Sequence, residues 1–147
     1  MVFIKRWLPA VIVMALIFCF SSLTEKQVSQ LTQPVINALN KVLEPVIHKA
    51  SPSFDWLKIG HMVGYSLLAI SFRHALIQYP KVKVPNVLSL FFSFLYSITD
   101  EFHQLFVLGR SSELRDVLID TSAASLAILL ILIINEFKKS RKLVKTN

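Results

Sequence analysis

The chain contains 147 residues, of which 54% are hydrophobic and 17% are charged, and its formal net charge is +7. A single domain of this length with a mean hydropathy of +0.57 indicates an integral membrane protein and excludes an ordinary soluble one. The positive charge does not indicate nucleic-acid binding, because it gathers beside apolar stretches and no recognition motif accompanies it.

The first apolar stretch, residues 7–24, carries no charge over 18 positions and follows Lys5 and Arg6. Its length and basic flank predict a membrane-spanning helix. A cleaved signal peptide is the alternative, but the apolar core is long and the residues after it make a poor cleavage site. Cys19, the only cysteine, lies inside this stretch, so no intrachain disulfide can form.

Residues 25–55 have a different pattern, in which apolar side chains such as Leu31 and Val35 recur at helical spacing opposite polar ones. Pro34 and Pro45 are expected to break or kink this amphipathic helix. Two interpretations stay open: the helix lies on the outer membrane surface, or it packs as a cover over the ends of the membrane helices.

Three more membrane-spanning helices are predicted at residues 56–79, 84–99 and 117–137. The third predicted helix can continue to Phe106, before Gly109 turns the chain. The predicted fold is therefore an all-α, single-domain bundle of four transmembrane helices with an amphipathic outer segment.

The basic residues predict how this bundle is oriented. They cluster at the N-terminus, in the turn that contains Lys81 and Lys83, and in the tail at residues 138–147. The positive-inside rule places all three regions in the cytoplasm. We therefore expect a multi-pass protein of the cell membrane with both termini cytoplasmic, whose amphipathic segment and third connection face outward.

The stretch at residues 99–120 holds five of the nine acidic residues and lies between two apolar helices. Charged groups at such depths are expensive to bury and are expected to pair with one another. Residues three or four apart share a helix face, so the second, third and fourth helices direct polar groups to one depth. The candidate site consists of Lys58, His61, Tyr65, Asp100, Glu101, His103, Gln104, Arg110, Asp116 and Asp120.

Several interpretations of this cluster stay open. Metal binding is disfavoured because the acids around His103 lack the spacing of a familiar zinc helix, and no cofactor is predicted. A carboxylate beside His61 or His103 would support acid–base catalysis, whereas Arg110 and Lys58 would suit an anionic phosphate or carboxylate. A structural salt-bridge network is the remaining interpretation. No known catalytic motif is present, so no catalytic residue is predicted.

The sequence also resembles the VanZ-like family, small membrane proteins named after a teicoplanin-resistance protein. The similarity extends over about residues 10–135. It rests on Phe20-Ser21-Ser22, on Lys58, His61 and Tyr65, on Asp100-Glu101-Phe102-His103-Gln104, on Gly109-Arg110-Ser111, and on Asp116 to Asp120.

The resemblance implies a bacterial cell-envelope protein with a link to glycopeptide susceptibility, and it supplies no mechanism. The leading hypothesis is that the outward polar cluster recognises an amphiphile at the outer leaflet, either a lipoglycopeptide antibiotic or an anionic envelope lipid. The alternatives are an enzyme that acts on an envelope lipid and a structural or partner-stabilising membrane protein. Membrane lipids are the expected surroundings, and the sequence identifies no protein partner.

Overall fold

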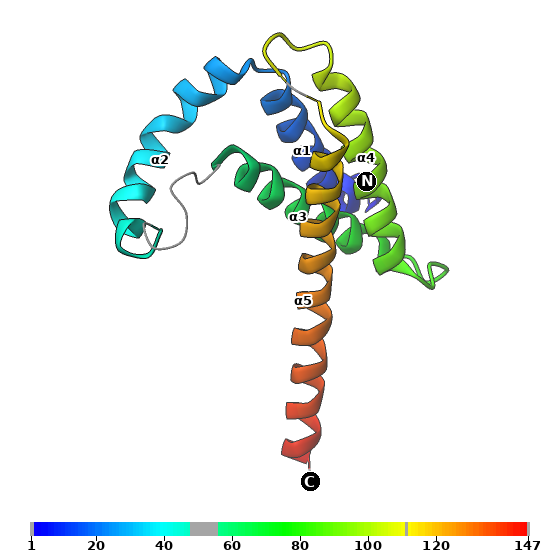
Figure 1. Cartoon of the computed structure of the whole chain (residues 1–147). Helices are drawn as coiled ribbons and strands as arrows, with labels where there is room; N and C mark the ends of the chain where they lie inside the picture. Colours follow the sequence, from blue (N-terminus) through cyan, green and yellow to red (C-terminus); the bar gives the residue numbers. More distant parts are fainter. Residues whose placement is uncertain (1, 48–55, 111, 147) are drawn as a thin grey trace.

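The computed structural model describes residues 2–47, 56–110 and 112–146 (Figure 1). These residues form five helices and no strand, which confirms the all-α prediction. The helices are α1 (Val2–Ser21), α2 (Glu25–Ile47), α3 (Trp56–Leu76), α4 (Pro85–Gln104) and α5 (Leu114–Thr146).

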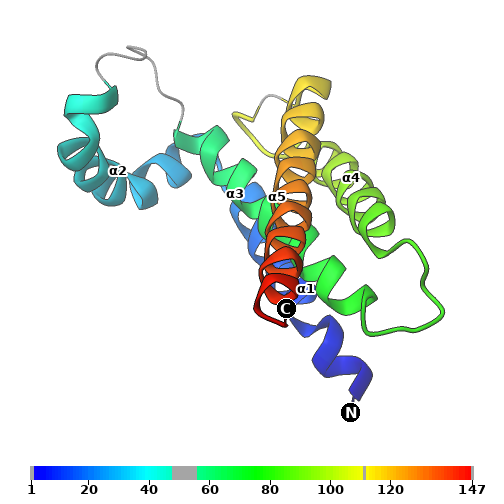
Figure 2. The same cartoon turned by 90° about the horizontal axis from the view of Figure 1, so that it is seen from below.

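Four of the helices form a bundle in which α3 packs against α1, α4 and α5, and α4 also packs against α5. Figure 1 shows that the lower half of α5 extends well beyond this bundle, and Figure 2 gives the view from below, with the C-terminal end of α5 in front. Tyr65, Leu68 and Phe72 of α3 form one hydrophobic core with Ala10 and Ile17 of α1. Helix α3 is therefore the central element against which the other three are placed.

Helix α4 has an unusual distribution of side chains, because its buried residues are all polar. Apolar side chains such as Phe91 and Phe102 are 51% and 62% exposed. The small serine side chains on the buried face allow α4 to pack closely against its neighbours. The buried residues of α4 are Ser89, Ser93, Ser97, Asp100, Glu101 and Gln104.

Helix α2 begins with a capping box. The backbone N–H of Thr24 donates to the side-chain amide oxygen of Gln27, and the N–H of Gln27 donates to the hydroxyl of Thr24. Pro34 and Pro45 do not break the helix, because α2 is continuous across both positions, and the alternative expectation of a kink stays a prediction. A proline inside a helix removes one backbone donor, and α2 keeps its helical conformation despite that loss.

The apolar face of α2 is largely uncovered. Leu31, Val35 and Val42 are 61%, 60% and 75% exposed, whereas Val28 near the start of the helix is buried. Figure 1 shows α2 standing away from the bundle. The described part of α2 is thus not a cover packed over the helix ends, and residues 48–55 of the predicted amphipathic segment lie outside the described residues.

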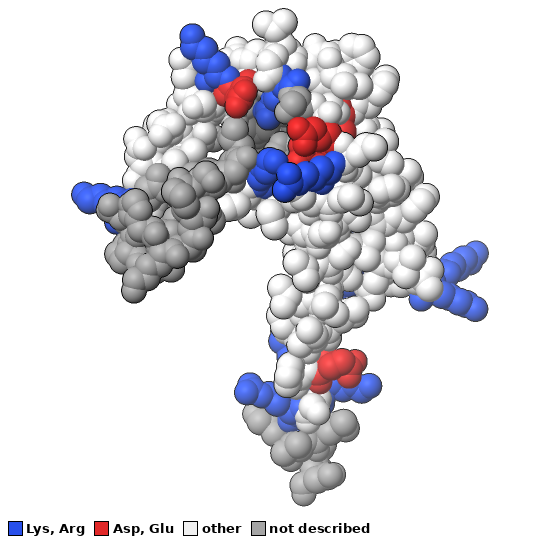
Figure 3. Space-filling view, in the orientation of Figure 1, with Lys and Arg blue, Asp and Glu red and all other residues white. Residues whose placement is uncertain are grey.

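Only α1 and α5 have the length and composition of a membrane span among the described helices, at Ile4–Ser21 and Leu114–Lys142. Helices α3 and α4 do not, because they carry ionisable residues and, in α4, three serines. The two apolar helices indicate membrane association, so the structure supports two of the four predicted spans. Figure 3 shows basic side chains at the turn between α3 and α4 and near the end of α5.

Candidate functional site

A cleft of about 140 Å³ lies where the start of α3, the end of α4 and the start of α5 meet. In the space-filling view, acidic and basic side chains lie side by side in this upper part of the molecule (Figure 3). Seven of the ten residues predicted for the site line the cleft. They are Lys58, His61, Glu101, Gln104, Arg110, Asp116 and Asp120.

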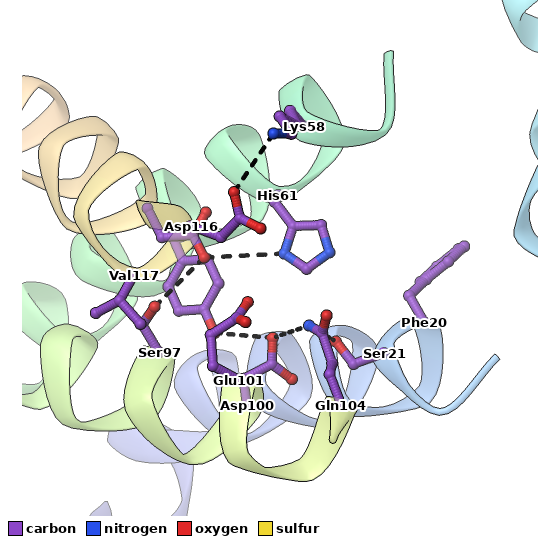
Figure 4. A network of polar contacts seen from close by, with 12 residues as sticks. Phe20, Ser21, Lys58, His61, Ser97, Asp100, Glu101, Gln104, Asp116 and Val117 are labelled. Carbon is purple, nitrogen blue, oxygen red and sulfur yellow. Dashed lines mark hydrogen bonds and ion pairs between the residues drawn. The ribbon is translucent and has the colours of Figure 1, made fainter. Parts of the chain in front are cut away.

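Two contacts join α3 to α5 at the cleft. Lys58 Nζ lies 3.6 Å from Asp116 Oδ1, and His61 Nδ1 lies 3.9 Å from Asp120 Oδ2 (Figure 4). Asp120 also accepts a hydrogen bond of 3.3 Å from the hydroxyl of Ser97 on α4. The spacing of three residues on α3 thus matches the spacing of four residues on α5, and Asp120 connects α3, α4 and α5.

A buried hydrogen-bond network lies next to the cleft. The Tyr65 hydroxyl donates to Asp100 Oδ2 over 3.1 Å, and Gln104 Nε2 donates to the same oxygen over 3.2 Å. Gln104 also contacts the hydroxyl of Ser21 at 3.4 Å (Figure 4). Tyr65 and Asp100 are therefore packed inside the bundle and do not line the cleft. Together with Gln104 and Ser21, they connect α3, α4 and α1.

Glu101 is an enclosed carboxylate of the cleft that has no basic partner among the described residues. It is 6% exposed, and its Oε2 accepts a 3.1 Å hydrogen bond from the backbone N–H of Glu113. Burial raises the pKa of the Glu101 carboxyl above its ordinary value, and hydrogen bonds from Ser112 and Glu113 partly offset that rise. Glu101 forms no ion pair with any described residue.

Arg110 binds backbone oxygens at the end of α1. Its Nε donates to the carbonyl of Leu23 and its Nη2 donates to the carbonyl of Phe20, each over 3.1 Å. The last carbonyls of a helix lack partners within the helix and carry partial negative charge, which a guanidinium complements. Gly109, at φ +79°, supplies the turn that precedes Arg110. Arg110 thereby holds the connection between α4 and α5 against α1.

His103 is separated from the other predicted residues. Its Nε2 lies 3.0 Å from the hydroxyl of Ser22, and its ring stacks on Phe18 with centroids 4.5 Å apart. His61 is thus the only one of the two candidate histidines that lines the cleft. Within the described part of the chain, no group of three or more His, Cys, Asp or Glu is placed to hold a metal ion.

The VanZ/LLP1 family model matches residues 6–135, which include every residue that lines the cleft. The chain belongs to the VanZ/LLP1 family. The family resemblance read from the sequence is thus confirmed over most of the chain. Comparisons with curated proteins and with solved structures found no match.

The cleft of this VanZ/LLP1 protein also contains residues that were not predicted for the site: Glu25, Gly109 and Ile119. Gly109 belongs to the motif that carried the family resemblance, so a signal for it was present. Glu25 had no such signal, because its place at the cleft depends on where α2 begins relative to the bundle. Lys58 is the basic partner of Asp116.

Proposed function

We propose that this VanZ/LLP1 protein is a multi-pass protein of the bacterial cell envelope that recognises the polar head of an amphiphile at the outer leaflet. In this proposal, recognition contributes to resistance against glycopeptide antibiotics of the teicoplanin type. The amphiphile is then a lipoglycopeptide drug or an envelope lipid. Family membership supports the link to antibiotic resistance, and the cleft supports recognition of a polar head.

The proposed membrane arrangement places residues 7–24, 56–79, 84–99 and 117–137 across the bilayer. Side chains on the outside of α3 and α4 support it, since Val63, Leu67 and Leu95 are 53%, 50% and 42% exposed. An apolar surface of this extent is typical of lipid contact. Basic residues at the N-terminus, the turn between α3 and α4 and the tail favour a cytoplasmic location for these regions.

The observation that carries the proposal is the concentration of ionisable side chains in one cleft of an otherwise apolar bundle. Charges near a bilayer are costly and tend to mark functional sites or to pair with one another. Lys58 and His61 have acidic partners, yet Glu101 remains without a basic one. A purely structural salt-bridge network would be expected to pair an enclosed carboxylate such as Glu101, which is 6% exposed, so its lack of a basic partner supports a ligand in the cleft.

The test of the function is an antibiotic-susceptibility assay in a sensitive bacterium that expresses the full chain. Glu101→Gln and Asp116→Asn should each remove the protection that the wild-type protein gives, at equal abundance in the membrane. Glu136→Gln is the matched control, because Glu136 is an exposed acid of α5 that does not line the cleft. Unchanged protection in both cleft variants would contradict the proposed role of the cleft.

A second function, catalysis on an envelope lipid, is favoured by one observation. His61 lines the cleft while its Nδ1 faces Asp120, an arrangement that can support proton transfer through the other ring nitrogen. The test is mass spectrometry of membrane lipids from cells that express the wild type, His61→Gln or Asp120→Asn. A lipid product that disappears in both variants would favour catalysis, whereas identical lipid profiles would favour recognition alone.

A further inference from the structure

We infer that the group recognised in this cleft carries an ammonium or a similar cationic hydrogen-bond donor, presented by an amphiphile. The inference rests on the proposed function and identifies the chemical class of its ligand. The inference is drawn from the charges of the residues that line the cleft. Four carboxylates line the cleft, compared with one lysine, one arginine and one histidine.

The two fully basic groups of the cleft are already engaged by the protein. Arg110 donates through Nε and Nη2 to the carbonyls of Leu23 and Phe20, so its planar fork is not directed at a ligand. Lys58 lies against Asp116. Bidentate recognition of a phosphate or carboxylate needs a guanidinium fork that is available to the anion. The anionic ligand considered from sequence is therefore the less favoured class.

The acidic side chains of the cleft, in contrast to the basic ones, can bind a cationic ligand. Asp116 and Asp120 face Lys58 and His61, but neither Glu101 nor Glu25 forms an ion pair with any residue that the structure describes. Glu101 is enclosed, and Figure 4 shows its carboxylate pointing from α4 toward α3 and α5. Glu25 is exposed and lines the cleft from the start of α2. A cationic donor between these carboxylates would form charge-assisted hydrogen bonds in a poorly solvated place.

The surroundings of the cleft indicate that the cation belongs to an amphiphile. Leu114 and Leu118 flank Asp116 along α5 and are 86% and 66% exposed. Phe102 and Phe106, on either side of Gln104, are 62% and 73% exposed. Apolar side chains at this end of the bundle provide a surface for an alkyl chain whose head lies in the cleft. A small soluble amine would gain the ionic contacts but none of this apolar contact.

The experiment is a calorimetric titration of the purified full chain in uncharged detergent micelles, with empty micelles subtracted. The probes are dodecylammonium, butylammonium and dodecyl phosphate. We expect saturable binding of dodecylammonium and much weaker binding of the other two. Glu101→Gln should weaken dodecylammonium binding by about tenfold or more, as expected for the loss of one charge-assisted hydrogen bond. Glu136→Gln, outside the cleft, should leave it unchanged.

A second variant keeps the test decisive if Glu101→Gln does not fold. Lys58→Gln removes the cation next to Asp116 and should strengthen dodecylammonium binding, whereas weaker binding would contradict the inference. Equal binding by wild type and Glu101→Gln would also overturn it. Preferred binding of dodecyl phosphate, lost in Arg110→Lys, would reject the ammonium class and leave the cleft as a recognition site. If none of the three probes shows saturable binding, the cationic ligand class is rejected. That result would also count against recognition of an amphiphile by the cleft, which the susceptibility assay tests independently.

Discussion

The phenolic hydroxyl of Tyr65 donates a hydrogen bond to Asp100 Oδ2 over 3.1 Å, and both side chains are buried. The other oxygen of Asp100 is buried without a hydrogen-bond partner among the described residues. Asp100 thus depends on Tyr65 and Gln104 for its hydrogen bonds. This dependence makes the Tyr65 hydroxyl important for stability, although Tyr65 does not line the cleft.

We therefore predict that Tyr65→Phe destabilises the folded protein by about 1 kcal/mol, near the upper range for single hydrogen bonds within membrane proteins. The ring of phenylalanine keeps the core packed, so the hydroxyl is the only group removed. The measurement is thermal unfolding of the purified chain in detergent. Tyr79→Phe is the control: it loses only the hydroxyl that accepts from Trp7, in a half-buried place. A smaller effect of Tyr65→Phe than of Tyr79→Phe would contradict the argument.

Spacing along the helices was enough to predict much of the site. Lys58 and His61 are three apart on α3, Asp116 and Asp120 are four apart on α5, and the structure brings the two pairs together. Such side-chain pairs can be predicted because residue type and helical period together determine them.

Contacts that involve the backbone could not be predicted in the same way. The partners of Arg110 are the carbonyls of Leu23 and Phe20, and a carbonyl has no residue-type signal. His103 was grouped with the site because it lies in the charged stretch at residues 99–120, yet its place on the helix turns it toward Phe18 and Ser22. Pro34 had a clear local signal, but one missing backbone donor does not end a helix that gains from the rest of its hydrogen bonds.

The number of membrane crossings can be tested with single cysteines in a Cys19→Ala background. A membrane-impermeant reagent added to intact cells should label Ser112→Cys and should not label Lys139→Cys. Lys83→Cys, in the turn between α3 and α4, distinguishes two spans from four. With four spans position 83 is cytoplasmic and protected, whereas with only α1 and α5 crossing it is labelled from outside. Labelling of Lys139→Cys from outside would overturn the proposed orientation.

Helix α2 is predicted to lie on the membrane with its apolar face in the lipid. Leu31 and Val35 are exposed on one side, whereas Gln33 and Asn37 share a hydrogen bond on the other. An environment-sensitive fluorophore on Val35→Cys should emit as in an apolar medium and be quenched by lipid-borne quenchers. The same fluorophore on Asn37→Cys should respond to aqueous quenchers. Similar spectra at the two positions would exclude a helix at the interface.

Binding of dodecylammonium should weaken on acidification, because a protonated Glu101 is neutral and no longer attracts the cation. Burial raises the pKa of Glu101, and the charges of Asp116 and Asp100 raise it further, whereas hydrogen bonds from Ser112 and Glu113 lower it. Since the net direction is upward, the loss of affinity should begin at a higher pH than for an exposed glutamate.

The measurement is the affinity for dodecylammonium between neutral and mildly acidic pH in wild type and Glu101→Gln. Several other charged groups line the cleft: Glu25, Lys58, His61, Arg110, Asp116 and Asp120. His61 acts in the same direction, because it gains positive charge as the pH falls. The variant retains all of these groups, so the difference between the two pH profiles isolates Glu101. We expect a shallower profile in Glu101→Gln, and parallel profiles would show that Glu101 does not control the binding of the cation.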